Sequence, residues 1–173
     1  PSVRFHPNLC PKIIRSKMIS SGFRIICVSQ RLFKDEILSP ENLYYVNDDS
    51  TVFQYAEGTD VTIACFNFSF PIGWNIYLKL KENGINASLF NINSPTPTCW
   101  DRIVENVKIT KKLIIIDDSK SRNLACDALL ADIYGKCNLE RKIILKRQLS
   151  EDWLNATSDQ MIVDLEQVVK ELN

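Results

Sequence analysis

Short apolar segments alternate with amphipathic helical segments along most of the chain. The strand-like segments are 60–66, 87–92, 113–116 and 142–145, and the helical segments between them are 71–83, 99–108 and 123–134. Strands that alternate with helices of 10 to 15 residues are typical of crossover connections in a parallel sheet. We therefore predict an α/β fold, a three-layer αβα sandwich around a mostly parallel five-stranded sheet.

The ends of these segments carry recognisable signals. Gly84 supplies a left-handed cap after the helix 71–83, and Ile85 is the apolar residue expected directly after such a cap. Gly135 is expected to close the helix 123–134 in the same manner. Near the end of the chain, Ser158 is expected to cap a last helix with an apolar stripe that runs from Met161 to Leu172.

The part before residue 58 has a different organisation. A helix is expected over 9–20 and one apolar strand over 23–28, but 29–56 lacks sustained periodicity, with Tyr44 to Val46 as its one candidate for extended structure. A loop this long indicates a linker. We expect a leading unit over 1–33, a linker over 34–57 and the main domain over 58–173. One helix and one strand leave sheet edges unpaired. The missing strands are then absent from this chain or supplied by another polypeptide, or the strand joins the following domain.

Composition excludes several classes of protein. Lys and Arg balance Asp and Glu at 21 each, so the chain has no excess charge that favours nucleic acid. No apolar run reaches the ~20 residues that span a bilayer, so no membrane association is expected. The six cysteines form no CxxC pair, and the fold has enough core without disulfides. We expect reduced thiols and a cytoplasmic location, with an organelle matrix as the other option.

Few residues offer catalytic chemistry. His6 is the one histidine, which argues against a histidine triad or a histidine-rich metal site. Asp117 and Asp118 follow the strand 113–116, at the sheet edge where α/β proteins bind ligands, and Ser119 and Arg122 lie where an anion could bind a helix start. The alternative is a structural role, in which the strand ends in solvated residues that cap the next helix.

Several stretches resemble a known family. They are Glu57-Gly-Thr-Asp-Val-Thr-Ile-Ala64, Asn83-Gly-Ile85, Ala87-Ser-Leu-Phe-Asn-Ile-Asn-Ser-Pro-Thr-Pro97 and Lys111-Lys-Leu-Ile-Ile-Ile-Asp-Asp118. Their order is similar to the last domain of the transketolase-like thiamine diphosphate enzymes, most of all to the β subunit of the decarboxylating component of pyruvate and branched-chain 2-oxoacid dehydrogenases. The segment 2–33 resembles the end of the preceding pyrimidine-binding domain, and the stretch from Lys146 to the final helix resembles the family's end.

The resemblance implies a cofactor site that lies elsewhere. In the family, a Gly-Asp-Gly motif and a Glu on other domains hold thiamine diphosphate with Mg²⁺, and no Gly-Asp-Gly occurs in this chain. Asn67-Phe-Ser-Phe-Pro71 stands where the family often has a Gly and then a His. We therefore expect no catalytic, cofactor-binding or metal-binding residues in the chain itself, and no catalysis by the isolated chain. The partner is expected to be a second copy or a different subunit that supplies the cofactor-binding domains.

Three functional hypotheses remain. The first is a C-terminal assembly domain of a thiamine diphosphate-dependent oxidoreductase or transferase, which supports the dimer and the active-site interface. The second is a noncatalytic paralogue that acts as a protein–protein interaction module. The third is an independent enzyme that uses Asp117 and Asp118. We also interpret the start at Pro1 as the mark of a processed or truncated product.

Overall fold

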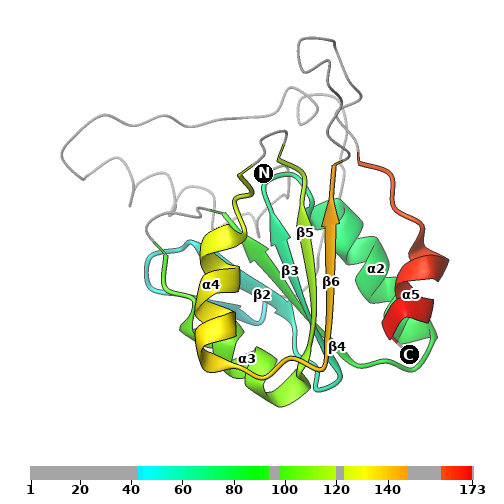
Figure 1. Ribbon diagram of the computed structural model, residues 1–173, viewed down its shortest axis with the longest axis horizontal. Helices are drawn as coiled ribbons and strands as arrows, with labels where there is room; N and C mark the ends of the chain where they lie inside the picture. The colour runs from blue at the N-terminus through cyan, green and yellow to red at the C-terminus, as the bar shows by residue number, and fades with distance from the viewer. Residues whose placement is uncertain (1–42, 94–97, 120–122, 148–160, 173) are drawn as a thin grey trace, which may run out of the picture.

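The central strands of this chain are apolar on both sides because helices cover both faces of their sheet. The computed structural model describes residues 43–93, 98–119, 123–147 and 161–172 (Figure 1). The strands are β1 (Tyr45–Val46), β2 (Val52–Ala56), β3 (Val61–Phe66), β4 (Ala87–Ile92), β5 (Lys112–Asp117) and β6 (Arg141–Lys146). The helices are α2 (Phe70–Glu82), α3 (Asp101–Thr110), α4 (Asp127–Lys136) and α5 (Leu165–Leu172).

The sheet is mixed and mostly parallel, with the strand order β1-β2-β4-β3-β5-β6. The four strands β4, β3, β5 and β6 are parallel neighbours, whereas β2 pairs antiparallel with β4 and β1 antiparallel with β2. In the central pair, Ile63 lies opposite Ile114 and Cys65 opposite Ile116. The expected α/β fold with a mostly parallel sheet is confirmed.

Two apolar layers hold the helices on the sheet. Alternate residues of each central strand face opposite layers, so that Ile63 and Ile116 pack on the side of α2 and α5, whereas Ala64 and Ile115 pack on the side of α3 and α4 (Figure 1). This arrangement is the predicted three-layer sandwich. It explains why the strands read as continuous apolar runs rather than as alternating ones.

The structure adds a strand that the sequence analysis missed. β2 lies within the segment expected to be a linker, 34–57, and all five of its residues are buried. Gln54 interrupts its apolar pattern and accepts a hydrogen bond from Arg102 Nε at 3.0 Å. With β1, which falls on the candidate extended stretch, this strand brings the sheet to six strands instead of the expected five. The leading unit expected over 1–33 lies outside the described residues.

Of the predicted helix ends, the cap at Gly84 agrees with the structure and several others differ. Gly84 has φ 74°, and the amide of Ile85 donates to Leu80 O at 2.9 Å, as expected for a left-handed cap. Gly135 does not close α4, which continues to Lys136. α3 and α4 begin at Asp101 and Asp127, later than predicted.

The last helix also differs from the prediction. It begins at Leu165, so Met161 precedes it. The carboxylate of Asp164 caps this helix, since its Oδ1 accepts hydrogen bonds from the amides of Glu166 at 3.0 Å and Gln167 at 3.2 Å. Ser158, the predicted cap, lies outside the described residues. Among the described residues, no helix is long and apolar enough to cross a membrane.

Candidate functional site

The topology singles out the C-terminal ends of the neighbouring strands β3 and β5. β3 and β5 are neighbours, but the chain leaves β3 through α2 toward β4 and leaves β5 through α4 toward β6, on opposite sides. Ligands of open α/β sheets bind at such switch points, outside the carboxyl ends of the strands. The residues that follow these two ends are Asn67 to Ser69 after β3 and Asp118 to Ser119 after β5, next to Asp117.

Asp117 connects three chain segments at this point. Its Oδ1 accepts hydrogen bonds from Asn67 Nδ2 at 3.0 Å and from the amide of Ser119 at 3.0 Å, and it also accepts from the Ser119 hydroxyl. Its Oδ2 accepts from the amide of Cys126 at 2.9 Å, where α4 starts. The side chain is fully buried. Both oxygens thus accept hydrogen bonds from the chain itself. We call this arrangement of Asp117 with Asn67, Ser119 and the amide of Cys126 the Asp117 bracket.

Asn67 completes the bracket from the β3 side. Its backbone has φ 57°, in the left-handed region that Asn tolerates better than most residues. This conformation turns the chain from β3 into α2, and Ser69 anchors the turn by donating its hydroxyl to Ile116 O at 2.8 Å. Asn67 was missed as a site residue, although a polar residue directly after a parallel strand is a usable signal.

Asp118 points to a different set of neighbours. Its Oδ1 accepts a hydrogen bond from the amide of Phe68 at 3.2 Å, and its Oδ2 lies 4.0 Å from a guanidinium nitrogen of Arg147. Arg147 Nε also donates to Asp118 O at 2.8 Å. Burial raises the pKa of the Asp118 carboxyl, and the amide of Phe68 and the charge of Arg147 oppose that rise without cancelling it.

The raised pKa gives a testable pH dependence. Because the folded chain retains the Asp118 proton at a pH where the unfolded chain has lost it, this group stabilises the fold in acid, and the contribution is lost as pH rises through the raised pKa. Asp118→Asn keeps an oxygen for the Phe68 amide and removes this dependence. At pH 7 we expect unfolding free energies equal to wild type within about 1 kcal/mol, or slightly higher.

Urea unfolding at pH 4 and at pH 7 measures the effect. The unfolding free energy of Asp118→Asn minus that of wild type should be lower at pH 4 than at pH 7. Asp49→Asn, at an exposed position, is the matched control and should show no such difference. A difference between Asp118→Asn and wild type that is the same at both pH values would contradict the prediction.

The thiol at this edge is not activated. Cys126 is fully buried, and burial together with the negative charge of Asp117 raises its pKa to about 12. Nucleophilic thiols have lowered pKa values in electropositive surroundings. Cys126 therefore has a packing role beside the start of α4.

The structure brings three of the four predicted edge residues together. Asp117, Asp118 and Ser119 share the switch point, and Arg122 lies outside the described residues. Arg147, which follows β6, was missed. In the described part of the chain, no three His, Cys, Asp or Glu side chains gather in a way that could hold a metal ion. Asp117 is fully buried and hydrogen-bonded at both oxygens within the chain, so its carboxylate is not placed to reach a Mg²⁺ ion.

Comparison with known proteins gives a fold but no family. No protein-family model matches the chain, and no curated protein does. A solved structure described as a split-gene transketolase in an inactive β4 tetramer is similar, with 17% identity over 65% of this chain and 36% of that chain and a TM-score of 0.50. A 2-oxoglutarate:ferredoxin oxidoreductase from Magnetococcus marinus, with 2-oxoglutarate, coenzyme A and succinyl-CoA bound, aligns at 15% identity over 75% of this chain and 20% of that chain, with a TM-score of 0.47.

The likeness to the split-gene transketolase, at 17% identity, concerns the fold alone. The part of that transketolase chain that is matched amounts to 36% of its length. The described residues therefore have a transketolase C-terminal-like α/β fold.

Proposed function

We propose that this chain is a C-terminal assembly domain of a thiamine diphosphate-dependent enzyme, either a 2-oxoacid dehydrogenase β subunit or a transketolase-like protein. Its role is to support the dimer and the interface that carries the active sites. The observation that carries this proposal is a transketolase C-terminal-like fold in which the Asp117 carboxylate, at the C-terminal end of β5, accepts hydrogen bonds from the chain itself. Such an arrangement stabilises the domain, because the buried Asp117 carboxylate accepts hydrogen bonds at both oxygens from the chain itself.

The split transketolase supports the same division of labour. That protein is described as an inactive β4 tetramer, so its chain assembles without activity in that form. In our proposal the present chain behaves similarly. A second copy or a different subunit supplies the domains that hold thiamine diphosphate and Mg²⁺, and residues 1–33 are a remnant of a pyrimidine-binding domain. The partition into 1–33, 34–57 and 58–173 belongs to this proposal, although β2 shows that the sheet begins before residue 58.

A noncatalytic paralogue is the second candidate. It is favoured by the segment Asn67 to Pro71, where the related enzymes often have a Gly and a His. Asn67 is used here for the turn and the bracket rather than for a substrate. Such a protein keeps the scaffold for assembly and has no thiamine diphosphate in its complex.

Purification from the native source, followed by calorimetric titration, tests the proposal. The isolated chain should not bind thiamine diphosphate with Mg²⁺ and should not turn over pyruvate. The native complex should contain a stoichiometric partner chain with a Gly-Asp-Gly motif and should bind the cofactor. A complex that contains a partner but binds no cofactor favours the paralogue. Cofactor binding by the isolated chain, or a monomer without any partner in the cell, overturns the proposed function.

A further inference from the structure

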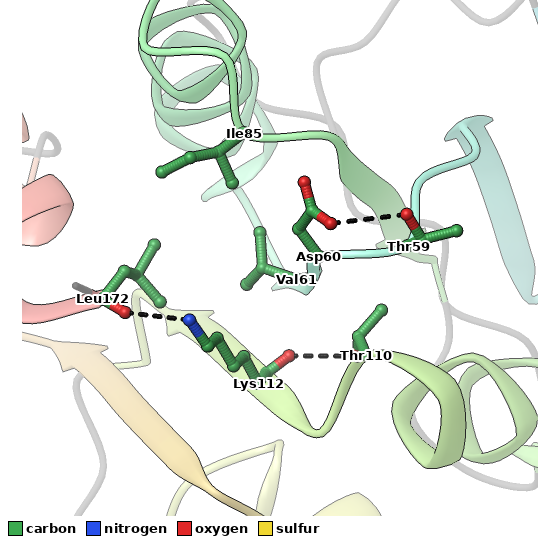
Figure 2. Close-up of a pocket in the computed structure, with 7 residues that line it drawn as sticks. All are labelled: Thr59, Asp60, Val61, Ile85, Thr110, Lys112 and Leu172. Carbon is green, nitrogen blue, oxygen red and sulfur yellow. Dashed lines mark hydrogen bonds between the residues drawn. The ribbon is translucent and has the colours of Figure 1, made fainter.

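A separate cavity lies at the opposite edge of the sheet, where the parallel strands begin. Its volume is about 330 Å³, and Figure 2 shows its lining. Val61 is the first residue of β3 and Lys112 the first of β5, while Ile85 precedes β4 and Leu172 ends α5. Ligand pockets measure ~300–1,000 Å³, so this cavity has the size for a small molecule. It is remote from the Asp117 bracket because it lies at the other end of the same strands.

The cavity has one charge of each sign. Thr62 pairs with Leu113, so Val61 and Lys112 begin neighbouring strands, which lie about 4.8 Å apart, and Asp60 directly precedes Val61. Figure 2 shows the Asp60 carboxylate on one side of Val61 and the Lys112 ammonium on the other. These two side chains line the same cavity from different sides.

Both charges are held in place and keep spare capacity. Asp60 Oδ2 accepts a hydrogen bond from the amide of Asn86 at 2.7 Å and Oδ1 accepts one from the hydroxyl of Thr59 at 3.3 Å, which leaves two of the about four acceptor positions of a carboxylate. Lys112 Nζ donates to Leu172 O at 3.1 Å, which is one of its three donors. Each group is thus fixed on its own side of the cavity and can still bind a ligand.

The surroundings determine which ligand end goes where. The helices α2, α3 and α5 all end near this sheet edge, and helix C-termini attract cations. The negative ends of these helix dipoles favour an ammonium group beside Asp60. The positive charge of Lys112 offsets the dipoles locally, so a ligand carboxylate is expected beside Lys112. Val61 and Leu172 are covered by the chain itself, whereas Ile85 is half-buried and gives the cavity an accessible apolar surface.

We propose that this cavity binds a small aliphatic zwitterion, with an α-amino acid of the size of leucine as the class of ligand. Its ammonium contacts Asp60, its carboxylate contacts Lys112, and its side chain packs on Ile85. This site goes beyond the proposed function, because it needs neither thiamine diphosphate nor a partner subunit. A failure of either proposal leaves the other intact.

Calorimetric titration of the full 173-residue chain with three related compounds tests the site. The compounds are leucine, 3-methylbutylamine, which lacks the carboxylate, and 4-methylpentanoate, which lacks the ammonium. Leucine should bind with a stoichiometry of one and at least tenfold more tightly than either of the others, because each lost charge contact costs about 1.4 kcal/mol or more. Equal affinity for leucine and either single-charge compound overturns the zwitterion.

Variants identify the two ends. Lys112→Met should weaken leucine and 4-methylpentanoate by tenfold or more and leave 3-methylbutylamine unchanged. Asp60→Asn, which keeps an oxygen for the Asn86 amide, should show the reverse selectivity. Ile85→Trp fills the cavity and should abolish binding of all three compounds. Lys136→Met on α4 is the matched control for Lys112→Met, because Lys136 pairs with Asp132 away from the cavity.

The melting temperature of each variant separates loss of binding from loss of folding. The crossed selectivity of Lys112→Met and Asp60→Asn is read within each variant, so it holds even where stability changes. No saturable binding of leucine up to about 10 mM overturns the proposal, since even a weak site with a Kd near 1 mM would be detected. Binding that none of the three cavity variants weakens overturns it equally.

Discussion

Gly58→Ala is expected to lower the unfolding free energy by roughly 3 kcal/mol, an effect at the upper end of overpacking substitutions. A Cβ at this position would lie 2.4 Å from Asn86 O and 2.5 Å from the carbonyl carbon of Ala87, both of them backbone atoms. Backbone in a parallel strand cannot move aside in the way that a flexible side chain can. The added methyl group therefore separates the residues before β3 from the start of β4.

The same substitution also strains a reciprocal hydrogen bond. The amide of Gly58 donates to Ser88 Oγ at 2.8 Å, and that hydroxyl donates back to Gly58 O at 3.0 Å. Moving Gly58 by the required distance lengthens both bonds, and the hydroxyl of Ser88 is fully buried. Loss of a buried partner costs about 1–3 kcal/mol, which adds to the steric term.

Urea unfolding followed by circular dichroism measures the change. Gly135→Ala is the matched control, because nothing lies within 4 Å of a Cβ at that position and the residue belongs to α4. Alanine is a better helix former than glycine, so this variant should gain about 0.5–1 kcal/mol. A loss below 1 kcal/mol for Gly58→Ala would show that the two strands separate more easily than the structure indicates.

Asp117→Asn should destabilise the chain by about 3 kcal/mol at neutral pH, because an amide cannot accept every bond that the carboxylate accepts. Donors face both oxygens of Asp117, from Asn67 and Ser119 on one side and from the amide of Cys126 on the other. Whichever way the new amide is oriented, its NH₂ group meets a donor. The buried position allows no water to fill the gap.

Asp118→Asn provides the comparison for this substitution. The two residues are adjacent and both are buried, but only Asp117 has donors at both oxygens within hydrogen-bonding distance. A large loss of stability for Asp117→Asn and a small one for Asp118→Asn would establish the bracket. If the two variants lose equal amounts, the bracket is not what holds α4 to the sheet.

Several elements were predictable because their signals are local. The strands β3, β4, β5 and β6 each carry an apolar run, and Gly84 with Ile85 is a cap that neighbouring residues define. Helix starts were less accurate, since the turn before α4 depends on Asp117 reaching the amide of Cys126 nine positions later in the chain. No local pattern reports such a contact.

β2 shows why one strand was missed. Its Gln54 is fully buried, and a glutamine in a five-residue apolar segment removes any clear periodicity. The residue is accommodated because Arg102, on α3, donates to its side chain. The partner lies 48 positions away in sequence, so the segment, which lacks sustained periodicity, was predicted to be a linker where the fold has a strand.

The location of the candidate site was predictable, but the contacts that its residues make were not. Asp117 and Asp118 follow an apolar strand, which indicates the carboxyl edge of a parallel sheet. Their different neighbours, with Asn67 for one and Arg147 for the other, depend on which strands lie side by side. Close packing has the same dependence: a Cβ on Gly73 would lie 2.1 Å from Cys65 Sγ, so the glycine lets α2 approach β3 without a shift of that side chain.

The sequence by itself determined the order of strands and helices and the two-sided burial of the sheet, because hydrophobic periodicity and cap residues act within a few positions along the chain. Tertiary structure alone decided that β2 joins the sheet, that Asp117 is an internal bracket, and that Asp60 and Lys112 flank one cavity. Each of these features joins residues that are distant in sequence. Their proximity arises only when the strands take their places in the sheet.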